Sequence, residues 1–311
     1  LFRSAAPTAQ FLAPARVNGA DGGVLLRGGH AAAFALPGRA HGPLKLGPQR
    51  LLLVARRPGT FAAIFDADGI AEGLAPQLFA PTRGRRFAGH AALSPDGRTL
   101  ALSEIDAETA EGYAVLRDAA SAAPLTEIAV GIEPHDLLFA GNDRLIVAVG
   151  GIAHAAEVKG PAINLGKIES SLVELNTRTG AVIRRHELGR GLQSLSLRHM
   201  ALSPDERDIA IGMQDQDRSE QRPLLGVLRV GHGIELLPLP EETGALRSYI
   251  GSVAYDASGA YIAATSPKGG VTGLWRVADG KALPGFALMD VCGLAAGSAP
   301  GTFWVTSGLG D

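Results

Sequence analysis

Residues 90–98 read His-Ala-Ala-Leu-Ser-Pro-Asp-Gly-Arg, and residues 199–207 repeat the phrase as His-Met-Ala-Leu-Ser-Pro-Asp-Glu-Arg. An alternating apolar stretch follows each copy. Proline presets the backbone of such a turn, and the aspartate side chain can accept a hydrogen bond from the backbone two residues on. The phrase therefore predicts two copies of a strand–turn–strand unit, which indicates a repeat architecture.

Four further strand–turn–strand phrases align with these two copies. The six phrases start at positions 41, 90, 135, 199, 252 and 292, so successive starts are 49, 45, 64, 53 and 40 residues apart. These intervals bracket the roughly 40–50 residues of a four-stranded propeller blade. Three more strand-like segments lie ahead of position 41. The sequence therefore predicts an all-β, seven-bladed β-propeller in a single domain of residues 1–311, with a closing blade shared between N-terminal and C-terminal strands. We expect the innermost strand of that blade to be absent from this chain.

Composition narrows the class of protein. The 29 Lys and Arg residues nearly balance 31 Asp and Glu residues, which argues against a nucleic-acid partner. The single cysteine excludes an intrachain disulfide and a cysteine-based zinc cluster. No apolar run reaches the roughly 18 residues of a membrane span. Small residues at 4–9 are typical of the region near a processing site, so we expect an exported protein.

Six phrases carry a resemblance to a known family. They are Arg56-Arg57-Pro58-Gly59, Gly131-Ile132-Glu133-Pro134-His135, Leu197-Arg198-His199, Tyr249-Ile250-Gly251-Ser252-Val253, Ser266-Pro267-Lys268-Gly269-Gly270 and Asp290-Val291-Cys292-Gly293. In order and spacing they resemble the bacterial family called domain of unknown function 1513, over about residues 36–310. The resemblance implies a periplasmic protein with a twin-arginine signal and a propeller similar to WD40 and quinoprotein-like folds. It also implies an association with imelysin-like and other iron-uptake proteins.

Histidine occupies four of the six aligned starts, and the other two are Ser252 and Cys292. In a propeller these positions begin the innermost strands, so they would surround one mouth of the central channel. Imidazole binds transition metals and carries protons near neutral pH. The predicted ligand-binding residues at this mouth are His41, His90, His135, Arg198, His199 and Cys292. The candidate metal ligands are His90, His135 and His199.

A structural interpretation of these histidines competes with the functional one. Propellers of the WD type commonly use such a histidine for a hydrogen bond within its own blade. Ring members on different blades can also be too far apart to share an ion at a metal–nitrogen distance of about 2.0–2.1 Å. The sequence predicts no catalytic residue and requires no cofactor.

Arg56 and Arg57 form a second candidate site. Paired guanidinium groups bind phosphates and carboxylates through rigid forks. The competing interpretation is that these arginines form ion pairs with Glu104 or Asp106, which end the corresponding strand of the next blade.

We therefore expect a monomeric, exported propeller that binds a partner protein or a small polar ligand at the channel mouth, in a setting of periplasmic iron uptake. The alternative is a periplasmic metal- or cofactor-dependent enzyme, a lactonase-like hydrolase or an oxidoreductase. A metal-dependent hydrolase would need converging Glu, Asp, Asn and His ligands, whereas the predicted ring is mainly histidine. That difference favours binding over catalysis.

Overall fold

The computed structural model describes residues 10–153, 164, 168–217, 219–229, 232–239 and 246–309. It divides into two compact units, Leu1–Ala129 and Val130–Asp311, and each is described by itself. Apart from the short helix α1 (Ala67–Ala71), the regular elements of the described residues are β-strands. The prediction of an all-β protein is therefore confirmed.

The first unit contains three antiparallel sheets, each with its strands in chain order. Their strands are β1 (Gln10–Val17), β2 (Ala20–Arg27) and β3 (His30–Ala35); β4 (Ala40–Lys45), β5 (Arg50–Ala55), β6 (Ala62–Asp66) and β7 (Gln77–Phe79); and β8 (Arg85–Leu93), β9 (Thr99–Asp106), β10 (Gly112–Asp118) and β11 (Pro124–Ala129). The second and third sheets have the four-stranded meander of a propeller blade.

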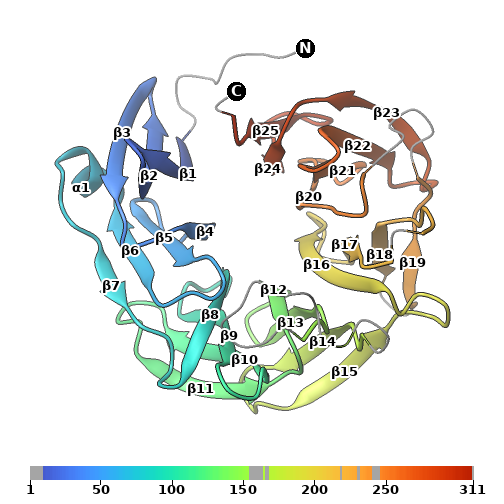
Figure 1. Ribbon diagram of the computed structural model, residues 1–311, viewed down its shortest axis with the longest axis horizontal. Coiled ribbons are helices and arrows are strands. Elements are labelled where there is room, and N and C mark those ends of the chain that lie inside the picture. The colour runs from blue at the N-terminus through green and yellow to red at the C-terminus, as the bar shows by residue number, and fades with distance from the viewer. Residues whose placement is uncertain are drawn as a thin grey trace. The chain divides into compact units, whose positions relative to one another are not determined.

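The second unit contains three more four-stranded meanders and a hairpin. Their strands are β12 (Pro134–Phe139), β13 (Arg144–Val149), β14 (Ser171–Asn176) and β15 (Val182–Glu187); β16 (Leu195–Leu202), β17 (Asp208–Asp215), β18 (Leu225–Arg229) and β19 (Ile234–Leu236); β20 (Ser252–Tyr255), β21 (Tyr261–Ser266), β22 (Val271–Arg276) and β23 (Ala282–Ala287); and β24 (Val291–Ala296) and β25 (Phe303–Ser307). Within this unit the first strands β12, β16 and β20 form one edge of their sheets, and the last strands β15, β19 and β23 form the other edge (Figure 1).

The β-propeller prediction is confirmed, but the predicted number of seven blades is wrong. The described residues form six blades, which are the sheet β1–β3 and five four-stranded sheets, besides the two-stranded sheet β24–β25. The N-terminal strands pair with one another through the two-residue turns Asn18-Gly19 and Gly28-Gly29. All four turn residues have positive φ, as two-residue hairpin turns require. The sixth predicted start, at position 292, forms only the hairpin β24–β25 rather than a four-stranded blade, so the described residues form six blades.

Alternate side chains of β5, the second strand of its blade, face two different sheets. In β5, Leu51 and Leu53 pack in one apolar cluster with Leu25 of β2, whereas Leu52 and Val54 pack in another cluster with Leu100 of β9. Four consecutive apolar residues are therefore buried, because the strand lies between two sheets. Neighbouring sheets of this unit stack in this way, and their first strands β4 and β8 lie side by side. In the second unit the first strands β12 and β16 lie side by side as well.

Candidate ligand-binding site

In the second unit two of the aligned starts, His135 and Cys292, are the extra residues of β-bulges, and a third bulge lies directly before the start His199. The pairing with β13 skips from Pro134 to Asp136, which leaves His135 as the extra residue of β12. The same shift leaves Arg198 as the extra residue of β16 and Cys292 as that of β24. A bulge frees one residue from the ladder and re-aims its side chain. By contrast, Ser252 of β20 pairs with Thr265 and no shift follows.

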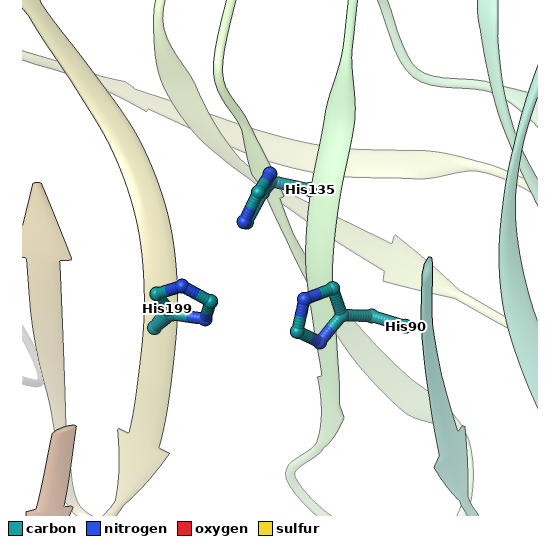
Figure 2. Close-up of side chains that lie close together, drawn as sticks. All are labelled: His90, His135 and His199. Atoms are coloured by element: carbon teal, nitrogen blue, oxygen red, sulfur yellow. The ribbon is translucent and has the colours of Figure 1, made fainter. Parts of the chain in front are cut away.

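The imidazoles of His135 and His199 meet edge to face. Their ring centroids lie 4.9 Å apart at an interplanar angle of 79°. Figure 2 shows them on the neighbouring strands β12 and β16. His199 is 7% exposed, and His135 is half-buried. The structure therefore brings two of the predicted site residues of this unit into contact.

Arg198 is the centre of this group of side chains. Its Nη1 atom donates to Oε1 of Glu133 at 2.6 Å and to Nδ1 of His135 at 3.0 Å. The ion pair is buried, with side-chain exposures of 5% for Arg198 and 2% for Glu133. Below, Arg198, Glu133, His135 and His199 are called the Arg198 cluster. The sequence prediction included its two histidines and Arg198, but not the role of Glu133.

The backbone on either side of Glu133 holds its carboxylate in place. Glu133 has a positive φ of 61°, and its carbonyl accepts a hydrogen bond from the Gly150 amide at 2.8 Å. Its Oε2 atom accepts from the Ile152 amide at 3.1 Å. A Cβ atom on Gly150 would lie 2.8 Å from this Oε2, so the close approach requires glycine. The carboxylate is thus fixed before any ligand arrives.

Further side chains link the blades that carry the Arg198 cluster. Oδ2 of Asp136 accepts from the Met200 amide at 2.9 Å, which joins β12 to β16. The Ser196 hydroxyl donates to the Gly150 carbonyl at 2.8 Å, and the Ser170 hydroxyl accepts from the Leu197 amide at 2.8 Å. These three side chains form hydrogen bonds to backbone groups and so hold the strands that carry the Arg198 cluster in position.

The first unit contains a second histidine pair. His41 of β4 and His90 of β8 meet at a centroid distance of 4.7 Å and an interplanar angle of 89°. Both lie at register shifts of their strands. Gly89, directly before His90, has a φ of 108°. A Cβ on Gly42, directly after His41, would lie 2.3 Å from the Gly89 carbonyl oxygen. The two strands can approach this closely because both positions are glycine. Figure 2 also labels His90.

Cys292 lies on β24, in a bulge equivalent to that of His135. Its Sγ atom donates to the carbonyl of Asp290 at 3.0 Å. Asp290 has a positive φ of 51°, and its carbonyl accepts from the Gly308 amide at 2.9 Å, just as Glu133 accepts from Gly150. The same backbone arrangement therefore occurs twice, with His135 as the extra residue of one bulge and Cys292 as the extra residue of the other.

The acidic members of the second candidate site have structural partners. Glu104 forms a buried ion pair with Arg117 at 2.9 Å and accepts from the Thr82 amide at 3.0 Å. The backbone amides of Thr109 and Glu108 hold the pKa of Asp106 below its ordinary value of 3.8. Sequence reasoning missed Arg117; its place directly after the apolar run Ala114-Val115-Leu116 of β10 was the available signal.

Arg56 and Arg57 directly follow β5. The Arg56 amide donates to the Arg39 carbonyl at 2.8 Å. Ligand binding by this pair of arginines stays a prediction.

The Ser-Pro-Asp phrases form the predicted turns. The Ser94 hydroxyl donates to Asp96 at 2.6 Å, and the Ser203 hydroxyl donates to Asp205 at 2.6 Å. Each aspartate also accepts from the amide two residues on. These bonds, led by the serine hydroxyls, hold the pKa of both aspartates below 3.8. The aspartates therefore shape the turn, as predicted.

Fold and site together define a β-propeller protein with polar clusters at the bulges of its first strands. The sequence matches the family described as "Protein of unknown function (DUF1513)" over residues 34–311, and the chain belongs to that family. No curated protein matches the sequence significantly. No helix in the part of the chain that the structure describes is long and apolar enough to cross a membrane.

Two solved structures have a similar fold. Hydrazine synthase of Kuenenia stuttgartiensis matches with a TM-score of 0.67 and 12% identity, over 88% of this chain and 83% of its own. The dihydro-heme d1 dehydrogenase NirN, in complex with DHE, matches with a TM-score of 0.61 and 17% identity. That match covers 99% of this chain but 60% of NirN. At such identities the likeness concerns the fold alone.

Proposed function

We propose that this protein is a binding protein and that the Arg198 cluster receives a small polar ligand. The observation that carries the proposal is the buried guanidinium of Arg198, which contacts a buried carboxylate and an imidazole on the neighbouring strand. A buried ion pair is costly to desolvate and is weak evidence for stabilisation. The Arg198–Glu133 pair differs from the buried Arg117–Glu104 pair because its guanidinium also contacts an imidazole of the neighbouring first strand. Ionisable groups gathered at such a site are candidates for function.

Binding is favoured over catalysis by what the neighbouring side chains do. The hydroxyls of Ser170 and Ser196 each form hydrogen bonds to the backbone, and Asp136 accepts a backbone amide. Nucleophilic catalysis by a serine hydroxyl needs that hydroxyl in contact with a general base. The groups that could serve are engaged in holding the two strands together.

One of the structural comparisons supports the proposal that a protein of this fold binds a small ligand. NirN is described as a complex with DHE, so a protein of similar fold binds a small molecule. From the family resemblance we further propose that the protein acts after export, in the periplasm, in connection with iron uptake. A protein partner at the same first strands is the alternative occupant.

The test compares Arg198→Lys with Arg229→Lys, a matched change of a half-exposed arginine on β18. Thermal unfolding is followed with sodium phosphate, sodium citrate, sodium acetate, zinc chloride or nickel chloride. A bound ligand at 100 times its Kd stabilises by about 2.7 kcal/mol. We expect at least one compound to raise the Tm of the wild type and of Arg229→Lys but not of Arg198→Lys. Equal shifts in all three proteins would contradict the proposal.

Metal binding is a second candidate function. Each unit holds two imidazoles in edge contact, His41 with His90 and His135 with His199, and imidazole is a common ligand of zinc, copper and nickel. The metal candidates remain His90, His135 and His199. Elemental analysis of protein purified without chelator tests this, with His90→Ala and His199→Ala as variants. Stoichiometric metal that both variants lose would support a metal site and reopen the enzymatic alternative.

A further inference from the structure

We infer that the Arg198 cluster selects a ligand that bears an oxyanion, a carboxylate or a phosphate, rather than a bare metal ion. This inference rests on the proposed function and specifies the class of ligand. It follows from which atoms of the cluster can donate hydrogen bonds and which can accept them.

The contact with Arg198 fixes the tautomer of His135. A guanidinium group has only N–H donors and no acceptor. Nδ1 of His135, 3.0 Å from Nη1 of Arg198, must therefore accept the hydrogen bond with its lone pair. In the neutral imidazole the remaining hydrogen then lies on Nε2. Any group that meets His135 at Nε2 meets a donor.

Arg198 offers a second donor. Its Nε atom is buried and finds no hydrogen-bond acceptor among the residues that the structure describes. The Arg198 side chain as a whole is 5% exposed. A buried N–H without an acceptor is costly, so such a group calls for a ligand or water that supplies one. A carboxylate or phosphate oxygen fits this requirement.

The same tautomer argues against His135 as a metal ligand. A histidine that binds a metal through one ring nitrogen usually donates the hydrogen of the other to a carboxylate or carbonyl. Here Nδ1 faces a guanidinium donor, the reverse of that arrangement. A cation at Nε2 would displace the hydrogen and add positive charge beside Arg198.

Glu133 sets how the ligand is recognised. Its carboxylate offsets the charge of Arg198 at 2.6 Å, so the pair carries little net charge. The ligand is then selected by directed N–H donors rather than by a strong positive field. Charge-assisted hydrogen bonds of this kind are short and directional.

The first measurement is the tautomer of His135. Protein labelled with ¹⁵N-histidine is examined at neutral pH by long-range ¹H–¹⁵N correlation NMR, and His135→Gln assigns the signals. We expect the Nε2–H form. An Nδ1–H form or an imidazolium would overturn the inference. His186→Gln, a change on the last strand β15, is the matched control and should leave the His135 signals unchanged.

The second measurement is binding, with sodium phosphate, sodium acetate and zinc chloride as separate probes. We expect phosphate or acetate at millimolar concentrations to shift the His135 signals saturably, and the response identifies which oxyanion is preferred. Arg198→Lys keeps the charge but loses Nε–H and the planar fork, so binding should weaken by about 10-fold or more. Arg229→Lys should bind as the wild type does.

The outcomes separate this inference from the proposed function. If zinc binds through His135 and neither oxyanion does, the oxyanion inference fails while ligand binding at the cluster stands. If no probe binds, both fail. Because Arg198→Lys can lose its fold, the double variant Glu133→Gln/Arg198→Met, which leaves no buried charge in the pair, provides a second protein that should not bind oxyanions.

Discussion

Arg198 of β16 donates from Nη1 to Nδ1 of His135 on β12 across 3.0 Å. The same nitrogen also reaches Glu133, so one terminal amino group joins three residues from two blades. The contact therefore does two things at once: it ties neighbouring sheets together and fixes the hydrogen-bonding character of His135.

Removal of Arg198 should destabilise the second unit strongly. In Arg198→Met the Glu133 carboxylate stays buried without its cation, which typically costs about 3–5 kcal/mol. The double variant Glu133→Gln/Arg198→Met should recover much of this loss. Chemical denaturation measures both, with Arg229→Met as a surface control expected to cost about 0–1 kcal/mol. A double variant as unstable as Arg198→Met would contradict the ion-pair explanation.

Gly150→Ala should disturb the Arg198 cluster through shape alone. The added Cβ would lie 2.8 Å from Oε2 of Glu133 and 2.9 Å from the Ser196 hydroxyl oxygen. Overpacking of this kind costs about 1–3 kcal/mol. Gly189→Ala is the matched control, since a Cβ there meets nothing within 4 Å. Denaturation midpoints of the two variants compare them directly, and equal midpoints would show that the carboxylate moves aside freely.

Glu174 should make the second unit less stable in acid. Burial alone would raise its pKa, but hydrogen bonds from Arg144 and His186 outweigh burial and leave the pKa below the ordinary 4.5. A carboxyl whose pKa is depressed on folding contributes stability above its unfolded pKa, which is lost as the pH falls through the folded value. Unfolding free energies of wild type and Glu174→Gln, measured from neutral pH to below pH 4.5, should therefore converge in acid. A constant difference would contradict this assignment.

Asp256 should control the mobility of the β24–β25 hairpin. Its fully buried carboxylate accepts from the amides of Ser258 and Tyr261 and, at 2.8 Å, from the amide of Gly301 in the hairpin turn. Asp256→Ala removes this tether, so hydrogen exchange in β25 should accelerate. Asp205→Ala alters an exposed turn aspartate instead and should leave exchange in β25 unchanged.

The sequence was informative wherever the chain pairs locally. The Ser-Pro-Asp turns and the alternating apolar stretches around them predicted the strands and the propeller, because a hairpin is decided by adjacent residues. The predicted number of blades was wrong because a local strand–turn–strand phrase reveals a hairpin but not whether two more strands complete its blade: the phrase at position 292 forms only β24–β25.

The site was predicted only in part. The aligned positions placed His135 and His199 on first strands, but the bulges could not be read from the sequence, since they depend on the register of each strand pair. The Arg198–Glu133 contact joins residues 65 positions apart, and no local pattern encodes it. Likewise, the buried ion pair of Glu104 with Arg117 in its own blade joins residues 13 positions apart, and no motif in the sequence indicates it.

The bulges separate the chemistry of this protein from its architecture. The extra residue of a first strand stands outside the ladder, so the backbone pairing on either side does not depend on its side chain. One such position is a histidine, another an arginine and a third a cysteine, while the blades around them keep the same strand order. A scaffold of this kind can present a different side chain from each blade on the same strand order. Where that side chain belongs to a buried ion pair, as Arg198 does, its partner Glu133 has to change with it.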